Sequence, residues 1–530
     1  MSSTAQVAPP ATASAKASSA EARFFDRPRT WALCLTVLLL VGILRIVSTY
    51  HVFNHTIDEP SHIACGVQWW DEGIYQIETK HAPLARISVA LGPYLAGVHA
   101  INAPTWRETY PILTEPGTNY WHVLTLGRIG VLPYFIIGTL VVFFWTKRIF
   151  DAVSGLIAAA IFTQLPTILA HSAVATTDMA LAVTFCWSLY AFTRWMQEPT
   201  FRHSAEFGVA TGLAICAKFS TFVFFPACAI PVLVMYFVAG KKEWGRLFRQ
   251  VWIAALCAFL VTWAIYRFSH APLAQVTAIP DRAAVKLFGP HSGMMSAVHA
   301  VTSHVPVPAP EILDGLRVLH NQVQEGVRSY FFGHTKQGGW WYFFFVAMTL
   351  KTPFAILVLA GIGSFVATRR YWRDRVNWEV AVPLVSAAVI MIITTPANLD
   401  SGVRYVMPMF LFVSILAAAG VVTLWMASSR QMVWRTAVAL LCGWFVLSSA
   451  LSHPDYLSYF NFLAGKDPSR IIVVGDYDWG QDMTRLANYL HQHSIRHVSI
   501  AYDGFYVPAS LDLPDTLKLE CRVVPSGWVA

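Results

Sequence analysis

Long apolar runs alternate with short polar segments along most of the chain. A helix needs about 20 apolar residues to cross a bilayer, and runs of this kind recur throughout the sequence. The pattern predicts about eleven membrane-spanning helices, of which the two within 206–239 would be short. The predicted spans are 31–50, 122–145, 152–170, 176–194, 206–218, 219–239, 251–268, 340–366, 377–395, 404–426 and 433–451.

Basic residues occur in every second polar segment. Arg23, Arg27 and Arg29 precede the first span, and the other basic clusters keep the same alternation. Because basic loops stay on the cytoplasmic side, we expect a cytoplasmic N-terminus and, with an odd number of spans, an extracytoplasmic C-terminus. The other clusters are Lys147 and Arg148; Arg194 and Arg202; Lys241, Lys242, Arg246 and Arg249; Arg369, Arg370, Arg373 and Arg375; Arg430 and Arg435.

The composition agrees with an integral protein of the plasma or inner membrane and excludes two other classes. Of the 530 residues, 55% are hydrophobic and only 13% are charged, which excludes a soluble globular protein. The net charge of +8 does not indicate nucleic-acid binding, because the basic residues form short clusters between apolar runs. The eight cysteines lack the spacing of a metal site. Cys65 and Cys521 share one predicted side of the membrane and could pair there.

The predicted fold is a polytopic α-helical membrane protein with a small extracytoplasmic α/β module. Residues 1–30 are expected to be a disordered cytoplasmic N-terminus, because they are rich in Ala and Ser. Residues 31–451 form the membrane domain, whose long outer loops are 51–121 and 269–339. Residues 452–530 form the module, which we expect to be incomplete because the last residues have the pattern of a further strand.

Within this module, two β-rich runs flank an amphipathic helix. Leu486, Tyr489 and Leu490 give that helix its apolar face. Asp476 and Asp478 follow the first β-rich run, where carboxylates often mark a ligand site. Capping of the next helix is the alternative explanation, and it is the one that we favour.

The first outer loop carries two adjacent carboxylates, Asp58 and Glu59, directly after the first span. Pro60 suits the first turn of a helix, so we expect a helix over residues 60–70. Its apolar stripe, Ile63, Val67 and Trp70, would suit the membrane interface. A carboxylate beside a second carboxylate is a natural general base, since the neighbouring charge raises its pKa.

Several motifs resemble one glycosyltransferase family. The segment IDEPSHIACG, followed by ETKHAPLA, resembles the first luminal loop of the dolichyl-phosphate-mannose–protein mannosyltransferases, glycosyltransferase family 39 of the GT-C superfamily. It is also similar to the bacterial lipid A aminoarabinose transferases. Ala82 departs from the pattern, since the family usually has a second Pro there. The resemblance covers most of the chain and recurs in ILAHSAVATTDMAL, SYFFGHTKQGGWWYFFFVAMTLKTP, NLDSGVRYVMPMF and HPDYLSYFNFLAGKDPSR.

The resemblance implies a GT-C enzyme that takes a sugar from a polyprenyl-phosphate donor at the outer face. The acceptor would be a hydroxyl on a protein, a lipid or a glycan. The resemblance implies that Asp58 is the general base and that Glu59 supports it. The leaving phosphate needs cations more than a general acid. The substrate-binding candidates are the cations Arg128, Lys218, Lys351 and Arg404, together with Glu78, His81 and Asp178.

A divalent metal ion is a further expectation, although the sequence defines no complete ligand set and therefore no firm cofactor. The resemblance places the ion near Glu78 and Asp178. The spacing of Glu59, His62 and Cys65 offers a second candidate set, since residues three apart share a helix face.

Each candidate also has a purely structural explanation. Asp58 could only cap a helix, and the cations could only extend toward the membrane interface. Two other functions remain open at this point. A transporter or flippase of polyprenyl-linked sugars needs charges deep in the membrane, and Lys351, about eleven residues into its span, is the residue that favours it. A hydrolase or phosphotransferase would act on the same lipid without an acceptor.

Overall fold

The structure is a computed structural model, which describes residues 27–115, 117–240, 243–276, 285–427, 431–500, 511–519 and 528–529. Most of the predicted disordered N-terminus lies outside these residues, and so does Cys521 with its predicted pairing. Residues 28–30, which the prediction assigned to that disordered segment, are instead the start of the first helix, where Pro28 fits the opening turn.

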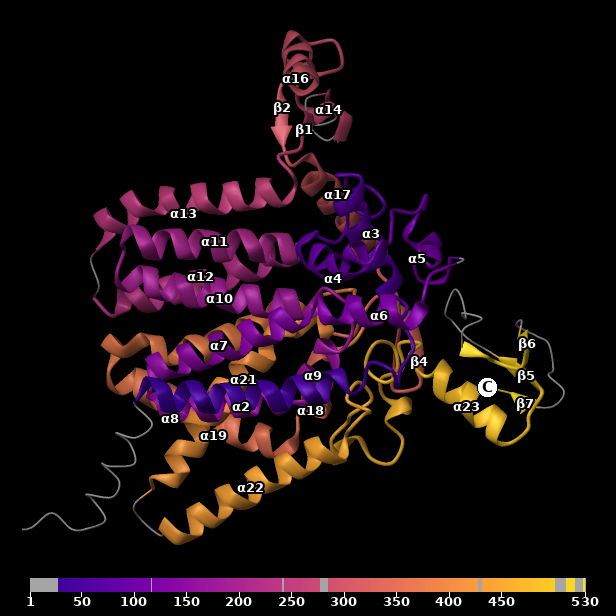
Figure 1. Cartoon of the computed structure of the whole chain (residues 1–530). Coiled ribbons are helices and arrows are strands. Elements are labelled where there is room, and N and C mark those ends of the chain that lie inside the picture. The colour runs from indigo at the N-terminus through magenta and orange to yellow at the C-terminus, as the bar shows by residue number, and fades with distance from the viewer. Residues whose placement is uncertain are drawn as a thin grey trace, which may run out of the picture.

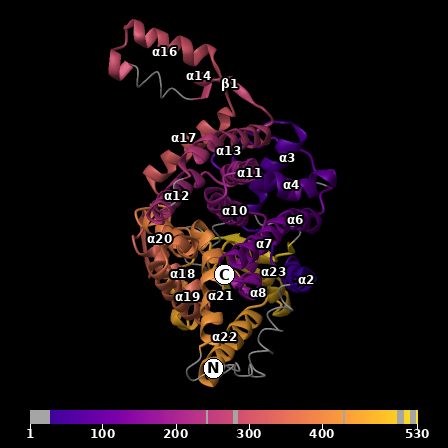
Figure 2. The same cartoon turned by 90° about the vertical axis from the view of Figure 1, so that its left-hand side faces the viewer.

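The core of the molecule is a bundle of long helices that lie side by side (Figures 1 and 2). The first half contains α2 (Pro28–Val47), α6 (Tyr120–Ile129), α7 (Leu132–Ile149), α8 (Ala152–Gln164), α9 (Pro166–Ser172), α10 (Asp178–Gln197), α11 (Phe201–Ala217), α12 (Thr221–Val238) and α13 (Trp244–Ile265). The second half contains α18 (Phe343–Lys351), α19 (Phe354–Arg373), η2 (Arg375–Ala381), α20 (Val382–Thr394), α21 (Pro408–Trp425) and α22 (Gln431–Leu451).

Glycines allow the closest helix pair, α19 and α21, to pack backbone against backbone. A Cβ on Gly363 would lie 1.8 Å from the carbonyl oxygen of Leu416, and one on Gly420 would lie 2.1 Å from that of Leu359. Small residues at such crossings are typical of helices packed in membranes. The contact holds α21, which follows the segment that carries Arg404, against α19.

Helices occupy all eleven ranges in which spans were predicted. Among the described residues, eight helices are long and apolar enough to cross a membrane, or nine if the α8–α9 pair, bent by 62°, is one span. The chain is therefore an integral membrane protein. The helices α10 and α11 are not among these, so the total of eleven stays a prediction. The predicted span 340–366 is two helices, because Pro353 interrupts it between α18 and α19.

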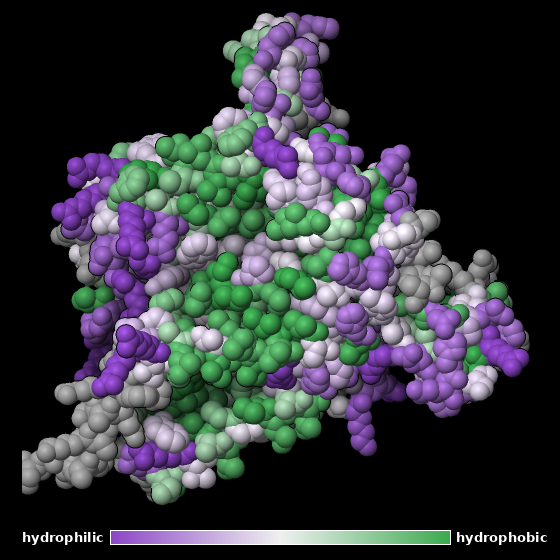
Figure 3. Space-filling model, in the orientation of Figure 1, coloured by the Kyte–Doolittle hydropathy of each residue, from purple (hydrophilic) through white to green (hydrophobic). Residues whose placement is uncertain are grey.

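An apolar band separates two polar ends of the bundle (Figure 3). At one end, Arg148 lies with Arg370 and Arg373 around a shared pocket, so two of the predicted cytoplasmic loops meet there. The first outer loop lies at the other end. Its elements are α3 (Glu59–Asp71), α4 (Leu84–Leu95), η1 (Trp106–Glu108) and α5 (Pro111–Thr114).

The predicted helix over 60–70 is present as α3, but its apolar stripe does not face a membrane interface. Ile63 and Val67 are fully buried, because α3 packs against α4 and α6. A Cβ on Gly66 would lie 2.0 Å from the carbonyl oxygen of Arg86, and one on Gly127 would lie 2.8 Å from Ile63 Cδ1. The first loop is therefore a packed layer of protein over the end of the bundle.

The elements of the second outer loop are β1 (His270–Pro272), α14 (Leu273–Val276), α16 (Gly293–His304), β2 (Pro306–Pro308), α17 (Pro310–Glu325), β3 (Arg328–Phe331) and β4 (His334–Gln337). Its first part, from β1 to β2, extends away from the bundle above α17 (Figure 1). β1 and β2 pair antiparallel where this part leaves and rejoins the rest of the loop, and β3 and β4 form an antiparallel hairpin.

The chain after α22 first crosses the end of the bundle that carries α3 and then forms a small α/β unit. The unit contains a parallel sheet in the order β6-β5-β7. The first predicted β-rich run, near Ile472, is not a strand, because it is packed onto the bundle as a turn with Ile472 buried. The elements are η4 (Phe462–Ala464), η5 (Pro468–Arg470), α23 (Met483–Gln492), β5 (His497–Ile500), β6 (Asp515–Lys518) and β7 (Trp528–Val529).

Candidate active site

Asp58 lies at the start of α3 and forms an ion pair with Arg404, which comes from the other half of the chain. Arg404 Nη1 donates to Asp58 Oδ2 at 2.6 Å, and its Nε donates to the carbonyl of Ser401 at 3.0 Å. Both side chains are partly exposed, 29% for Asp58 and 16% for Arg404. Asp58 occupies the N-cap position, but its carboxylate makes no capping hydrogen bond. Its contacts therefore do not support the explanation that it only caps a helix.

Glu59 is fully buried and pairs with a different arginine, Arg128. The guanidinium donates to both carboxylate oxygens, at 2.9 and 3.0 Å, and the backbone N–H groups of Thr56 and Ala175 donate to them at 2.8 Å each. An arginine has five N–H donors, and Arg128 uses all of them. The remaining three bonds go to the carbonyls of Tyr50, Phe53 and Asn54. These contacts favour a positioning role for both residues.

Opposite charges set the pKa of both carboxyl groups. Burial alone would raise the pKa of Asp58, but Arg404 and then His62 outweigh it and hold this pKa below the usual value. For Glu59, Arg128 likewise outweighs burial and lowers the pKa. The expectation that the pKa of the base is raised is therefore wrong, because Arg404 lowers the pKa of Asp58. Asp58 is ionised at neutral pH and can accept a proton.

Asp178 and Lys218 form a second ion pair at this end of the bundle. Lys218 Nζ donates to Asp178 Oδ1 at 2.8 Å and lies 4.9 Å from the ring centre of Tyr405. His171 Nδ1 lies 3.8 Å from Asp178 Oδ2. Tyr405 follows Arg404 directly, so the two ion pairs are neighbours. Two of the predicted cations therefore lie beside two of the predicted carboxylates.

Glu78 and His81 belong to a cluster organised by Arg86. Arg86 Nη2 donates to Glu78, and Lys80 pairs with the other oxygen of Glu78 at 2.8 Å. Arg86 Nε donates to His62 Nδ1 at 3.0 Å, so the His62 proton is on Nε2. Burial and then Arg86 lower the pKa of His62 to about 4. The ring of His81 lies 5.4 Å from that of His62.

Lys351 does not lie free in the membrane. Its Nζ donates to the carbonyls of Leu457 and Asp476, at 2.5 and 2.7 Å, and lies 4.4 Å from the ring centre of Phe460. These contacts tie the segment after α22 to the break between α18 and α19. They favour a structural role over phosphate binding.

The candidate metal ligands are occupied by protein cations. Glu78 binds Lys80 and Arg86, and Asp178 binds Lys218. In the second candidate set, Glu59 binds Arg128 and His62 Nδ1 accepts from Arg86. No group of three or more His, Cys, Asp or Glu that could hold a metal ion occurs among the described residues. These residues do not fit a metal ion, and the expectation stays untested.

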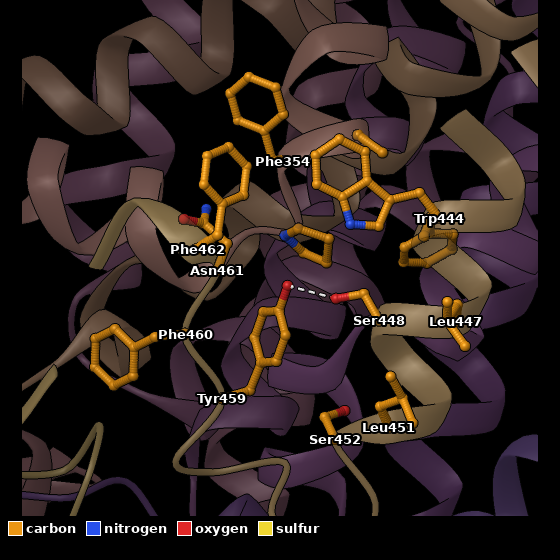
Figure 4. Close-up of a pocket in the computed structure, with 13 residues that line it drawn as sticks. Phe354, Trp444, Leu447, Ser448, Leu451, Ser452, Tyr459, Phe460, Asn461 and Phe462 are labelled. Atoms are coloured by element: carbon orange, nitrogen blue, oxygen red, sulfur yellow. Dashed lines mark hydrogen bonds between the residues drawn. The ribbon is translucent and has the colours of Figure 1, made fainter. Parts of the chain in front are cut away.

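An apolar pocket of about 590 Å³ lies beside this end of the bundle, between α19, α22 and residues 459–462 (Figure 4). Its wall is aromatic, with the rings of Trp444 and Phe462 stacked at 5.6 Å. The hydroxyl of Tyr459 is bonded to that of Ser448 at 2.9 Å. Asn461 Nδ2 donates to two backbone carbonyls near Lys351. The pocket therefore shares a wall with the segment that Lys351 holds.

Two residues at the site were not singled out from the sequence. Arg86 sits on a predicted outer loop, where an arginine gives no signal of burial, yet it is fully buried. Trp479 belongs to the chain after α22, and its ring centre is 4.3 Å from Arg404 Cζ. No local pattern of the sequence predicts this contact, because only the fold brings Trp479 to Arg404.

Comparison with known proteins supports the resemblance. Residues 126–270 match the family model of the dolichyl-phosphate-mannose-protein mannosyltransferases. The matched segment contains Arg128, Asp178 and Lys218 but not Asp58. No curated protein sequence matches the chain significantly.

Two solved structures share the fold. One is ArnT from Cupriavidus metallidurans bound to undecaprenyl phosphate, with 13% identity, a TM-score of 0.50, and coverage of 93% of this chain and 86% of that one. The other is the oligosaccharyltransferase of Archaeoglobus fulgidus in the apo form, with 12% identity, a TM-score of 0.50, and coverage of 90% and 63%. The fold of the chain is that of these two structures. Together with the family match, it indicates a membrane glycosyltransferase.

Proposed function

We propose that this protein transfers a sugar from a polyprenyl-phosphate donor to an acceptor hydroxyl at the extracytoplasmic surface. The observation that carries the proposal is the ion pair of Asp58 with Arg404 at 2.6 Å. It lies at the end of the bundle opposite Arg148 and Arg370, which belong to the basic, cytoplasmic end in this orientation. The family match and the undecaprenyl phosphate bound to ArnT support the choice of donor.

The proposed chemistry needs a base and a cation side by side. The acceptor oxygen attacks the anomeric carbon, its proton goes to the Asp58 carboxylate, and the bond to the phosphate oxygen breaks toward the polyprenyl phosphate. Arg404 suits the leaving phosphate because its Nη2 has no hydrogen-bond acceptor among the described residues, while Nε and Nη1 are held. Lys218, fixed by Asp178, supplies a second positive charge nearby.

In this proposal the other predicted residues shape the site. Glu59 and Arg128 fix the loop that carries Asp58. Glu78 and His81 belong to the same loop, where Glu78 binds Arg86 and His81 lies against His62. The proposal requires only a hydroxyl of the acceptor, which is a protein, a lipid or a glycan.

The alternative of a transporter or flippase is weaker than the sequence suggested. Lys351 was the residue that favoured it, and the ammonium of Lys351 is bound to two backbone carbonyls. A charge engaged in this way holds the fold together and offers no free group to a moving substrate.

The test uses purified protein in nanodiscs with a panel of radiolabelled polyprenyl-phosphate sugars and an envelope extract as acceptor. We expect the wild type to form a labelled product and Asp58→Asn to lose more than about a hundredfold of the rate, the scale of general-base catalysis. Asp71→Asn is the matched control, since Asp71 lies in the same loop but binds His99 and the backbone of Ala100.

Equal rates for wild type and Asp58→Asn would remove Asp58 from catalysis. Label that crosses the bilayer without a new covalent product would indicate a flippase. Release of free sugar without an acceptor would indicate a hydrolase.

A further inference from the structure

The ion pair at the centre of the site rests on an aromatic ring from the chain after α22. The guanidinium carbon of Arg404 lies 4.3 Å from the ring centre of Trp479, and Trp479 is buried, with 3% of its surface exposed. Asp58 and Arg404 are 346 positions apart in sequence. Something outside both segments must therefore hold them together, and Trp479 contacts one of them directly.

The same turn is bonded to the backbone next to Asp58. The N–H of Ile57 donates to the carbonyl of Trp479 at 3.1 Å. Asn54 Nδ2 donates to the carbonyl of Gly480 at 2.7 Å, and Asn54 Oδ1 accepts from the N–H of Met483 at 2.8 Å. The residues just before α3 are therefore bonded to the main chain of this turn.

The other side of the turn is bonded to the residue before Arg404. The carboxylate of Asp476 accepts from the N–H of Val403 at 3.1 Å, and Lys351 donates to the carbonyl of Asp476. Gly402 has a φ of +91°, and a Cβ there would lie 3.1 Å from the Asp476 carboxyl. Only glycine suits both this φ and this approach. The turn over residues 475–483 therefore clamps both halves of the ion pair.

We propose that Trp479 is a positioning residue for the transfer reaction, which holds Arg404 in the one orientation that binds Asp58 and leaves Nη2 for the donor phosphate. This inference rests on the proposed function. A guanidinium that lies over the face of a ring is held there by the cation–π attraction. Without the ring, Arg404 keeps its charge but loses this support, so the phosphate and the base are no longer aligned.

The test compares Trp479→Leu with Trp479→Phe, which keeps a ring. We expect Trp479→Leu to lower kcat about three- to thirtyfold, the range of a cation–π contact, and Trp479→Phe to stay within about twofold. The acid limb of the kcat/KM profile should move to higher pH in Trp479→Leu only. The reason is that Arg404 holds the pKa of Asp58 down, against burial and together with His62 and Lys80.

A matched control separates positioning from stability. Trp378 is equally buried, beyond α19 at the opposite end of the bundle, and packs on Tyr236 at 5.9 Å. Trp378→Leu should lower Tm as much as Trp479→Leu without moving the acid limb. Wild-type kcat and an unmoved limb in Trp479→Leu would overturn the proposal, and so would equal losses in the Leu and Phe variants.

A binding measurement keeps the two proposals apart. We expect undecaprenyl phosphate alone to bind Trp479→Leu more weakly than wild type, and Trp479→Phe as tightly as wild type. If the wild type transfers no sugar but this difference in binding is seen, the transferase activity is rejected and the positioning of Arg404 stands. Equal binding by all three would reject the positioning role.

Discussion

Two neighbouring carboxylates, Asp58 and Glu59, each bind an arginine, but the two pairs differ in what surrounds them. Glu59 and Arg128 are buried and fully hydrogen-bonded. Asp58 and Arg404 are partly exposed, and Arg404 Nη2 has no acceptor among the described residues. A closed pair fixes the fold, whereas an open pair can exchange a partner for a substrate. The same two residue types therefore do different work at adjacent positions.

The largest expected effect comes from breaking the closed pair. Glu59→Gln leaves Arg128 buried without its counter-charge, which costs about 3–5 kcal/mol of stability. We expect a marked fall of Tm in detergent and poor recovery of folded protein. Glu198→Gln is the control, since Glu198 is 66% exposed. A Tm for Glu59→Gln equal to that of wild type would show that the pair is not what fixes the loop.

Changing the open pair should affect activity instead. Arg404→Lys keeps a charge but loses the planar fork that binds both Asp58 and a phosphate. We expect transfer to fall about tenfold to a hundredfold, while Tm changes little. Arg470→Lys, at a residue whose side chain is 84% exposed, should leave both unchanged. Full activity in Arg404→Lys would show that the planar guanidinium of Arg404 is not needed to bind Asp58 and the phosphate together.

The sequence predicted the features that depend on neighbouring residues, but not the contacts between residues far apart in the chain. The helices, the loop with Asp58 and the helix over 60–70 follow from hydropathy and local signals. Adjacent residues at a helix start point in different directions, so the pattern could not tell which carboxylate would be closed. Arg128 and Lys351 read as free cations, because their acceptors are mostly backbone carbonyls that no residue pattern announces. The contact of Trp479 with Arg404 depends on tertiary packing alone.

A third carboxylate, Asp400, can be compared with Asp58 and Glu59, because no cation is bonded to it among the described residues. Trp340 N–H donates to its Oδ2 at 2.5 Å, while Oδ1 is buried without a partner. Burial raises the pKa of Asp400 from 3.8 to about 6. Because the folded pKa is higher than the unfolded one, ionisation costs stability, and the cost grows from about pH 4 and is complete above pH 6.

Asp400→Asn should therefore raise the free energy of unfolding at pH 8 by on the order of 1–3 kcal/mol, and Tm should rise with it. At pH 4 both should change little. Thermal unfolding at the two pH values measures this difference. A stabilisation that is equal at both pH values would show that the charge of Asp400 is not its cause.

The smallest expected effect concerns metal ions. Since Glu78 and Asp178 already bind lysine and arginine side chains, we expect a chelator to change the transfer rate less than about twofold, far below the loss that follows removal of a catalytic metal. Loss of activity on chelation that Mg²⁺, Mn²⁺ or Zn²⁺ restores would mean that one of these carboxylates exchanges its protein cation for a metal.

The most direct test of the contrast is a single-turnover measurement on Asp58→Asn and Glu59→Gln, both kept well below their unfolding temperatures and saturated with donor. The account predicts that Asp58→Asn binds donor and stays folded but transfers more than about a hundredfold more slowly. It predicts that folded Glu59→Gln stays within about tenfold of wild type, since Glu59 touches no reacting atom. The reverse result, a fast Asp58→Asn and a folded but inactive Glu59→Gln, would contradict it.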